Sequence, residues 1–148
     1  MKHEVLKPFL EKALAQWAEV EAVEADGDGD YVFRRGSAEF FVRLTKDDPP
    51  VLKLWSVLLK KVKPSPRVFR VLNSVNSVLS FARIYAKDDL VILSMEMSTD
   101  SMDGAAVAWA CDVVGMLADD LDTRLKDELG GKTAHPDEPE DEADAVKV

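Results

Sequence analysis

The sequence predicts a single α+β domain of the order α-β-β-β-α-β-β-α, with an antiparallel sheet packed against helices. Apolar residues recur at three- and four-residue spacing in three segments, which predicts three amphipathic helices. Five shorter segments are rich in β-forming residues, several with alternating apolar positions, and turn residues separate them, which predicts five strands. A chain of 148 residues that is 47% hydrophobic suits one core rather than two.

Charge and composition exclude several classes of partner. The formal net charge is −9, so a nucleic-acid backbone or an anionic membrane surface would repel the protein, whereas a basic or apolar partner is compatible. No run of about 18 apolar residues and no export signal is found, and the single Cys111 falls on an apolar helix stripe as a buried, reduced thiol. These observations predict a cytoplasmic protein without a membrane span.

The first helix is predicted from apolar residues between Val5 and Trp17. Proline is tolerated in the first turn, so Pro8 predicts a helix start between Val5 and Lys7, with an end near Glu19. The next segment, Val20 to Ala25, is interpreted as a short strand or the approach to one.

The stretch Asp26-Gly27-Asp28-Gly29-Asp30 is predicted to be a solvated turn. Its alternating aspartates resemble a calcium loop, but an EF-hand needs glycine at the sixth position and glutamate at the twelfth, where this chain has Tyr31 and Ser37. No metal site is therefore expected.

Three strands are expected next. Tyr31–Arg35 and Ala38–Thr45 form a hairpin around Gly36-Ser37, and Lys46–Pro50 ends the pairing because successive prolines donate no ladder hydrogen bonds. The third strand, Val51 to Val62, is apolar on both faces: Val51, Trp55, Val57 and Leu59 alternate with Leu52, Leu54 and Leu58. Such a strand is either covered on both sides or gives its second face to a partner. The lysines that follow, Lys60, Lys61 and Lys63, indicate a solvated edge.

A second helix is predicted to start at Ser65-Pro66, where serine can cap the helix and proline already has helical φ. Val68, Leu72, Val75 and Leu79 predict that this helix is heavily buried. Asn73 and Asn76 are unfavourable inside a helix unless their side chains have partners. They either form hydrogen bonds from the helix to the following hairpin or make a polar contact in a binding groove.

The second hairpin and the last helix complete the domain. Phe81–Ala86 and Leu90–Met97 are predicted strands joined by Lys87-Asp88-Asp89. The last helix is expected to be capped by Asp100 or Ser101 and to end at Gly130-Gly131. Its polar side, expected to face solvent, holds Asp119, Asp120, Asp122 and Arg124.

The segment from Lys132 to Val148 has two prolines, six acidic side chains and almost no large apolar group. It is predicted to be a disordered acidic tail that raises solubility or masks a sticky surface, which gives a domain over 1–131 and a tail over 132–148.

No catalytic constellation is found in the sequence. Its two histidines, His3 and His135, lie outside the predicted core, and Cys111 has neither a neighbouring histidine nor a helix N-terminus to activate it. We find no phosphate-binding glycine loop and no metal-ligand spacing. The sequence therefore predicts a protein that is not an enzyme and has no cofactor.

The segment Val71-Leu72-Asn73-Ser74-Val75-Asn76, followed by Phe81-Ala82-Arg83-Ile84-Tyr85, resembles the YbjN-like family. The resemblance continues through Ala118-Asp119-Asp120-Leu121-Asp122 and covers Val5 to Gly131. It implies the fold of type III secretion chaperones such as CesT, which are small, acidic, usually dimeric proteins that bind unfolded segments of their clients.

Two functions are compatible with this resemblance. The first is a non-enzymatic, homodimeric, chaperone-like domain that holds a client protein or peptide, with Trp55, Val57 and Leu59 at the partner or dimer interface and Leu54 in the core. The alternative is a regulatory module of a sensory or stress pathway that binds one folded partner.

Overall fold

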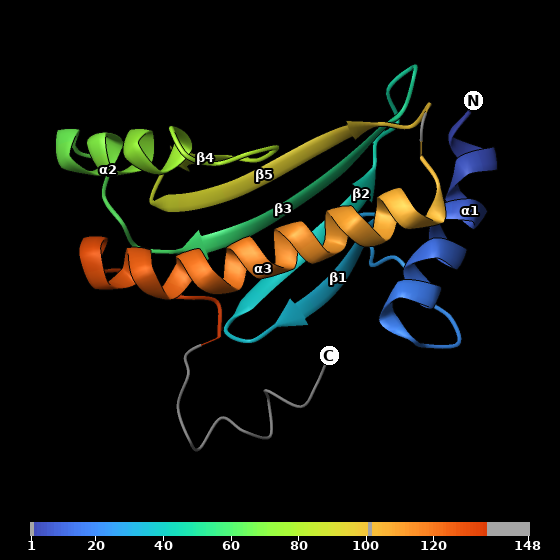
Figure 1. Ribbon diagram of the computed structural model, residues 1–148, viewed down its shortest axis with the longest axis horizontal. Coiled ribbons are helices and arrows are strands. Elements are labelled where there is room, and N and C mark those ends of the chain that lie inside the picture. The colour runs from blue at the N-terminus through green and yellow to red at the C-terminus, as the bar shows by residue number, and fades with distance from the viewer. Residues whose placement is uncertain (1, 101, 136–148) are drawn as a thin grey trace.

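The computed structural model describes residues 2–100 and 102–135, and its elements follow the predicted order (Figure 1). The fold is α+β, with one five-stranded antiparallel sheet of strand order β1-β2-β3-β5-β4. The elements are α1 (His3–Ala18), β1 (Asp30–Arg35), β2 (Ala38–Leu44), β3 (Val51–Leu59), α2 (Pro66–Asn76), β4 (Arg83–Lys87), β5 (Leu90–Ser98) and α3 (Gly104–Leu129).

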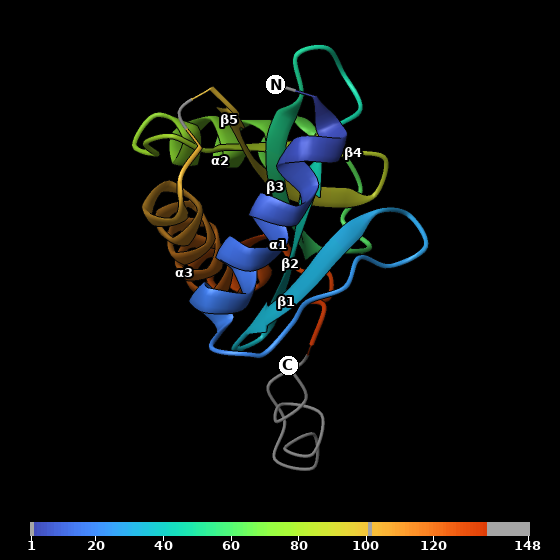
Figure 2. The ribbon, with the colours of Figure 1, turned by 90° about the vertical axis from the view of Figure 1, so that its right-hand side faces the viewer.

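The helices cover one face of the sheet (Figure 2). The long helix α3 crosses β1, β2, β3 and β5, α1 packs beside α3, and α2 lies against β4. The core lies between them, because alternate residues of each strand point to this side and are buried. On β2, β3 and β5, these residues are Ala38, Phe40, Val42, Leu44, Leu52, Leu54, Leu58, Val91, Leu93 and Met95.

The first helix starts earlier than predicted, at His3, and Pro8 lies inside it. The backbone carbonyl of Lys2 accepts hydrogen bonds from the amides of Val5 and Leu6, at 3.1 Å each, so a first turn exists before the proline. The missing amide of Pro8 removes one hydrogen bond near an exposed helix end, and the buried Leu6 and Leu10 hold the helix in place on both sides of it. Residues 20–25 form no strand.

The prediction that the second helix is heavily buried is wrong. Only Val68 and Leu72 of α2 are buried, whereas Phe69 is 53% exposed. The helix lies at the margin of the sheet against β4, so its apolar stripe is wider than the surface it covers. The predicted start is confirmed, because the Ser65 hydroxyl accepts a hydrogen bond from the Val68 amide at 3.2 Å.

The last helix differs from prediction at its start and on its polar side. Its cap is Asp103, whose carboxylate accepts from the Ala106 amide at 2.7 Å, rather than Asp100; Ser101 lies outside the described residues. Gly130 ends the helix with a φ of 78°, as predicted. Asp122, expected on the solvent side, is fully buried.

The chain continues past Gly131 along the sheet. Lys132 and Lys60 exchange two backbone hydrogen bonds, of 2.8 and 2.9 Å, and Thr133 is buried. Ordered structure therefore extends to His135, four residues into the predicted tail; the rest of that tail, 136–148, lies outside the described residues. Among the described helices, none has both the length and the apolar character needed to cross a membrane.

Candidate functional site

The face of the sheet that points away from the helices carries the candidate site, and we call it the open face (Figure 2). Its side chains alternate with the core residues, and no helix of the described part of the chain packs over it. One cross-strand row runs through all five strands, in the order Val32, Phe41, Trp55, Ser94 and Arg83.

Aromatic rings and cations meet at the centre of the open face. The rings of Phe41 and Trp55 stack with centroids 5.2 Å apart at an interplanar angle of 18°. The guanidinium of Arg43 lies 5.2 Å from the Trp55 ring centroid, and the ammonium of Lys53 lies 5.6 Å from it. Val32, at the β1 end of the same row, is 41% exposed. The result is an aromatic surface bordered by positive charge.

The charge of the open face differs from that of the whole chain. By strand alternation it carries the cations Arg34, Arg43, Lys53, Arg83 and Lys87 and the acids Asp30, Glu39 and Glu96. Arg43 pairs with Asp30, and Arg83 pairs with Glu96 at 3.0 Å. Within the described residues, Lys53 makes no ion pair. An acidic protein therefore presents a face with an excess of positive charge, which net charge does not reveal.

The structure separates the three predicted interface residues. Trp55 and Val57 lie on the open face and are partly exposed, and Leu54 is in the core as expected. Leu59 was predicted to share their face, and this placement is corrected, because its side chain is 0% exposed. A register shift between Val57 and Leu59 places Leu58 and Leu59 together in the core. Strict alternation cannot anticipate such a bulge.

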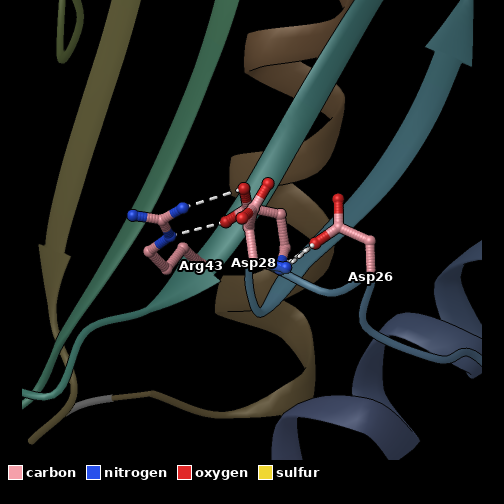
Figure 3. A network of polar contacts seen from close by, with 4 residues as sticks. Asp26, Asp28 and Arg43 are labelled. Atoms are coloured by element: carbon pink, nitrogen blue, oxygen red, sulfur yellow. Dashed lines mark hydrogen bonds and ion pairs between the residues drawn. The ribbon is translucent and has the colours of Figure 1, made fainter.

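The aspartate turn forms a closed polar network at one end of the open face (Figure 3). The Asp26 carboxylate accepts from the backbone amides of Asp28 and Asp30, at 2.9 and 3.0 Å. Asp30 receives two hydrogen bonds from the Arg43 guanidinium, which raises the pKa of Arg43. The carboxylate oxygens of Asp26, Asp28 and Asp30 lie within 4.8 Å of one another, and the cation beside them is Arg43. The predicted solvated turn is confirmed for Asp26 to Gly29, whereas Asp30 begins β1 and is buried.

Sequence reasoning missed a second network, which fastens the β1–β2 hairpin to α3. The Ser37 hydroxyl donates to Asp122, with oxygens at 2.8 and 3.0 Å, and the Ser37 amide donates to Asp119 at 3.2 Å. Gly36 has a φ of 58°, and a Cβ there would lie 2.1 Å from the Asp119 carboxylate. The signal in the sequence was the spacing of Asp122, which is four residues from Ala118 and three from Leu125, both buried.

Burial raises the pKa of Asp122 above its ordinary value. Hydrogen bonds from Ser37 and Thr123 favour the ionised carboxylate and oppose this shift, and the nearby Asp119 adds to it. The side chain therefore accepts hydrogen bonds in a site where its charge is costly. Its geometry indicates a structural fastening of the hairpin.

Asn73 and Asn76 differ in their contacts. Asn76 binds both backbone groups of Ile84, donating from Nδ2 to the carbonyl and accepting at Oδ1 from the amide, each at 2.8 Å. This confirms the predicted link from helix to hairpin for Asn76. Asn73 is exposed, and its side chain makes no hydrogen bond within residues 2–100 and 102–135.

The residues considered for catalysis are far from an active arrangement. Cys111 is fully buried, as predicted, and burial together with Asp112 raises its thiol pKa to about 12, so no reactive thiolate forms near neutral pH. His135 contacts Glu39, with Nε2 and Oε2 3.1 Å apart. His3 lies at the start of α1.

Comparisons with known proteins agree with this fold. The family described as T3SS (YopN, CesT) and YbjN peptide-binding chaperone 1 matches residues 4–137. No curated protein matches the chain. Among solved structures, the crystal structure of the ExsC-ExsE complex has a similar chain, with a TM-score of 0.66 at 13% identity; the match covers 83% of this chain and 96% of that one.

Proposed function

We propose that this chain, which belongs to the family of T3SS (YopN, CesT) and YbjN peptide-binding chaperones, holds an extended segment of a client protein on the open face of its sheet. The observation that carries the proposal is the Phe41–Trp55 stack beside the cross-strand pair Arg43 and Lys53, on a sheet face that no helix of residues 2–100 and 102–135 covers. Apolar client side chains would pack on the rings, and client carboxylates would meet the cations.

The open face suits a client without a folded structure of its own. A row of side chains at fixed strand spacing offers contacts to alternate residues of an extended chain. The edge of the sheet at β4 is less suitable for strand addition, because Asn76 already occupies the backbone groups of Ile84. The open face is therefore the favoured surface, with Trp55 and Val57 as its contact residues.

The test is binding of the full chain to an array of short peptides, compared with the variants Trp55→Asp and Val57→Asp. We expect the wild type to capture a subset of peptides and each variant to lose at least about tenfold in affinity, which corresponds to one buried contact of about 1.4 kcal/mol. Phe9→Asp on α1 is the matched control, because Phe9 is also partly exposed but lies on a helix of the opposite side of the sheet.

Three results would contradict the proposal. Unchanged capture by folded Trp55→Asp would remove the open face as the site. Equal loss in Phe9→Asp would place the site on the helical side. An array without any bound peptide, beside pull-downs that recover one intact protein, would favour the alternative of a regulator that binds a folded partner.

We also propose a homodimer, with its interface away from the open face. Phe81 and Trp109 make an edge-to-face ring contact, with centroids 5.1 Å apart, yet are 73% and 42% exposed. Three further large apolar side chains are exposed: Phe69 on α2, Val78 in the loop after α2, and Met116 on α3. Exposed aromatic pairs of this kind are typical of protein interfaces.

A further inference from the structure

We propose that the acidic segment after His135 binds the open face of its own chain and competes there with external peptides. Binding of the segment to the open face concerns this chain alone, whereas its competition with external peptides rests on the proposed function. The segment contains six acids, of which five lie within six residues: Asp137, Glu138, Glu140, Asp141 and Glu142.

The path of the chain after α3 leads to the open face. Lys132 pairs with Lys60 at the end of β3, and the His135 amide then donates to the Ser37 carbonyl at 3.2 Å, in the β1–β2 turn. The His135 ring contacts the Glu39 carboxylate at 3.1 Å. Glu39 alternates with the buried Ala38 and Phe40, so its side chain is on the open face. The helix α3 lies on one side of the sheet, and the His135 ring contacts a side chain on the other.

The segment is long enough to reach the aromatic centre. An extended chain advances about 3.3 Å per residue, so the five acids, two to seven residues after His135, reach roughly 7–23 Å from it. Arg43 is four residues beyond Glu39 on β2, about 13 Å away, and neighbouring strands are about 4.8 Å apart. Arg43 and Lys53 are therefore within reach.

Charge favours binding of this acidic segment at the open face over binding at the rest of the surface. The net charge of the chain is −9, and these five acids contribute −5 of it, so the rest of the chain has a net charge of −4 and is still acidic, whereas Lys53 and Arg43 lie on the open face. Tethering gives such a segment a millimolar effective concentration, so weak contacts suffice for partial occupancy. The alternative cations, Lys60, Lys61 and Lys63, are exposed at the end of β3 and form one outcome of the test.

The experiment compares the full wild-type chain with a full-length variant in which the five acids are neutralised (D137N/E138Q/E140Q/D141N/E142Q). Proton–nitrogen NMR spectra of both should differ at the Trp55 indole and at the amides of Phe41, Arg43 and Lys53. Unchanged open-face signals, or changes confined to Lys60, Lys61 and Lys63, would overturn the proposal.

A binding measurement tests the competition. The probe is a dye-labelled peptide with the sequence of residues 136–148, and we expect the neutralised chain to bind it about two- to tenfold more tightly than the wild type does. Lys53→Glu in the neutralised chain should weaken that binding, whereas Lys12→Glu, an exposed charge change on α1, should leave it unchanged. Equal affinity of the wild type and the neutralised chain would contradict the competition.

Failure of this inference and failure of the proposed function give different results. If the array peptides bind wild type and neutralised chain equally well, the tail does not compete, and the client-binding proposal stands. If the Trp55 signal responds to neutralisation but no array peptide binds either chain, the tail occupies the face and the client-binding proposal fails.

Discussion

At the scale of single residues, Asp122 shows how a carboxylate can be buried without a catalytic or metal-binding task. Its oxygens accept hydrogen bonds from the Ser37 hydroxyl and from the Thr123 amide, the latter at 2.6 Å. Hydrogen bonds satisfy the side chain, but they do not fully replace water around its charge, so its pKa is raised. The free-energy cost of burying the charged Asp122 carboxylate, which holds the hairpin, therefore depends on pH.

The stability of the protein should respond to Asp122 in a pH-dependent way. An acid with a raised pKa in the folded state stabilises the fold below its unfolded pKa, and this contribution is lost as pH rises through the folded pKa. Asp122→Asn keeps an acceptor oxygen without the charge. The difference in free energy of unfolding between this variant and the wild type should therefore shift in favour of the variant from about pH 4 to about pH 7. Asp122→Ala should cost about 1–3 kcal/mol at both, because Ser37 and Thr123 lose a partner.

Urea denaturation at the two pH values measures both effects. Asp120→Asn is the matched control, because Asp120 lies on the exposed side of the same helix in an ion pair with Arg124. A difference between wild type and Asp122→Asn that stays constant with pH would show that the titration of Asp122 is not linked to folding.

At the scale of elements, one side chain joins α2 to the sheet. β4 is an edge strand, and the backbone groups of Ile84 that Asn76 binds would otherwise lack a strand partner. A helix with only two buried apolar residues, Val68 and Leu72, depends on such a link to keep its position. The same contact protects the edge from pairing with another chain.

Asn76→Ala should therefore destabilise the protein by about 1–3 kcal/mol, because it leaves the Ile84 amide and carbonyl unpaired beside a buried side chain. Asn73→Ala is the control on the same helix and should change the free energy of unfolding by less than about 0.5 kcal/mol, because the Asn73 side chain makes no hydrogen bond within the described residues. Chemical denaturation of the two variants measures the contrast. Equal losses would show that the contact of Asn76 with Ile84 does not stabilise the fold.

The elements were predictable from sequence to different degrees. The order of helices and strands is confirmed, because alternation and helical spacing report local backbone geometry. Burial of α2 was overestimated, since an apolar stripe such as the one with Phe69 does not say how much surface lies opposite it. The bulge at Leu59 and the fastening of Ser37 by Asp122 depend on contacts between distant segments, which periodicity does not encode.

At the scale of the whole molecule, the two faces of the sheet carry different kinds of side chains. The helical side holds the core and, at its margin, the exposed pair Phe81 and Trp109. The open face carries rings and cations. The net charge of −9 predicted a basic or apolar partner, but the excess of positive charge around Trp55 favours acidic, aromatic or aliphatic segments at that place. This local placement of charge supports the proposal of an acidic or apolar client segment at Trp55.

The oligomeric state tests this division of surfaces. Light scattering after size exclusion should give the mass of a dimer for the full chain, and Phe81→Asp should shift it to a monomer, because a charge would enter the apolar contact with Trp109 and the second copy. Trp55→Asp should remain a dimer, since the proposed dimer interface lies away from the open face. A dimer that Trp55→Asp dissociates and Phe81→Asp does not would place the second copy on the open face. The binding surface for clients would then have to be sought on the helical side.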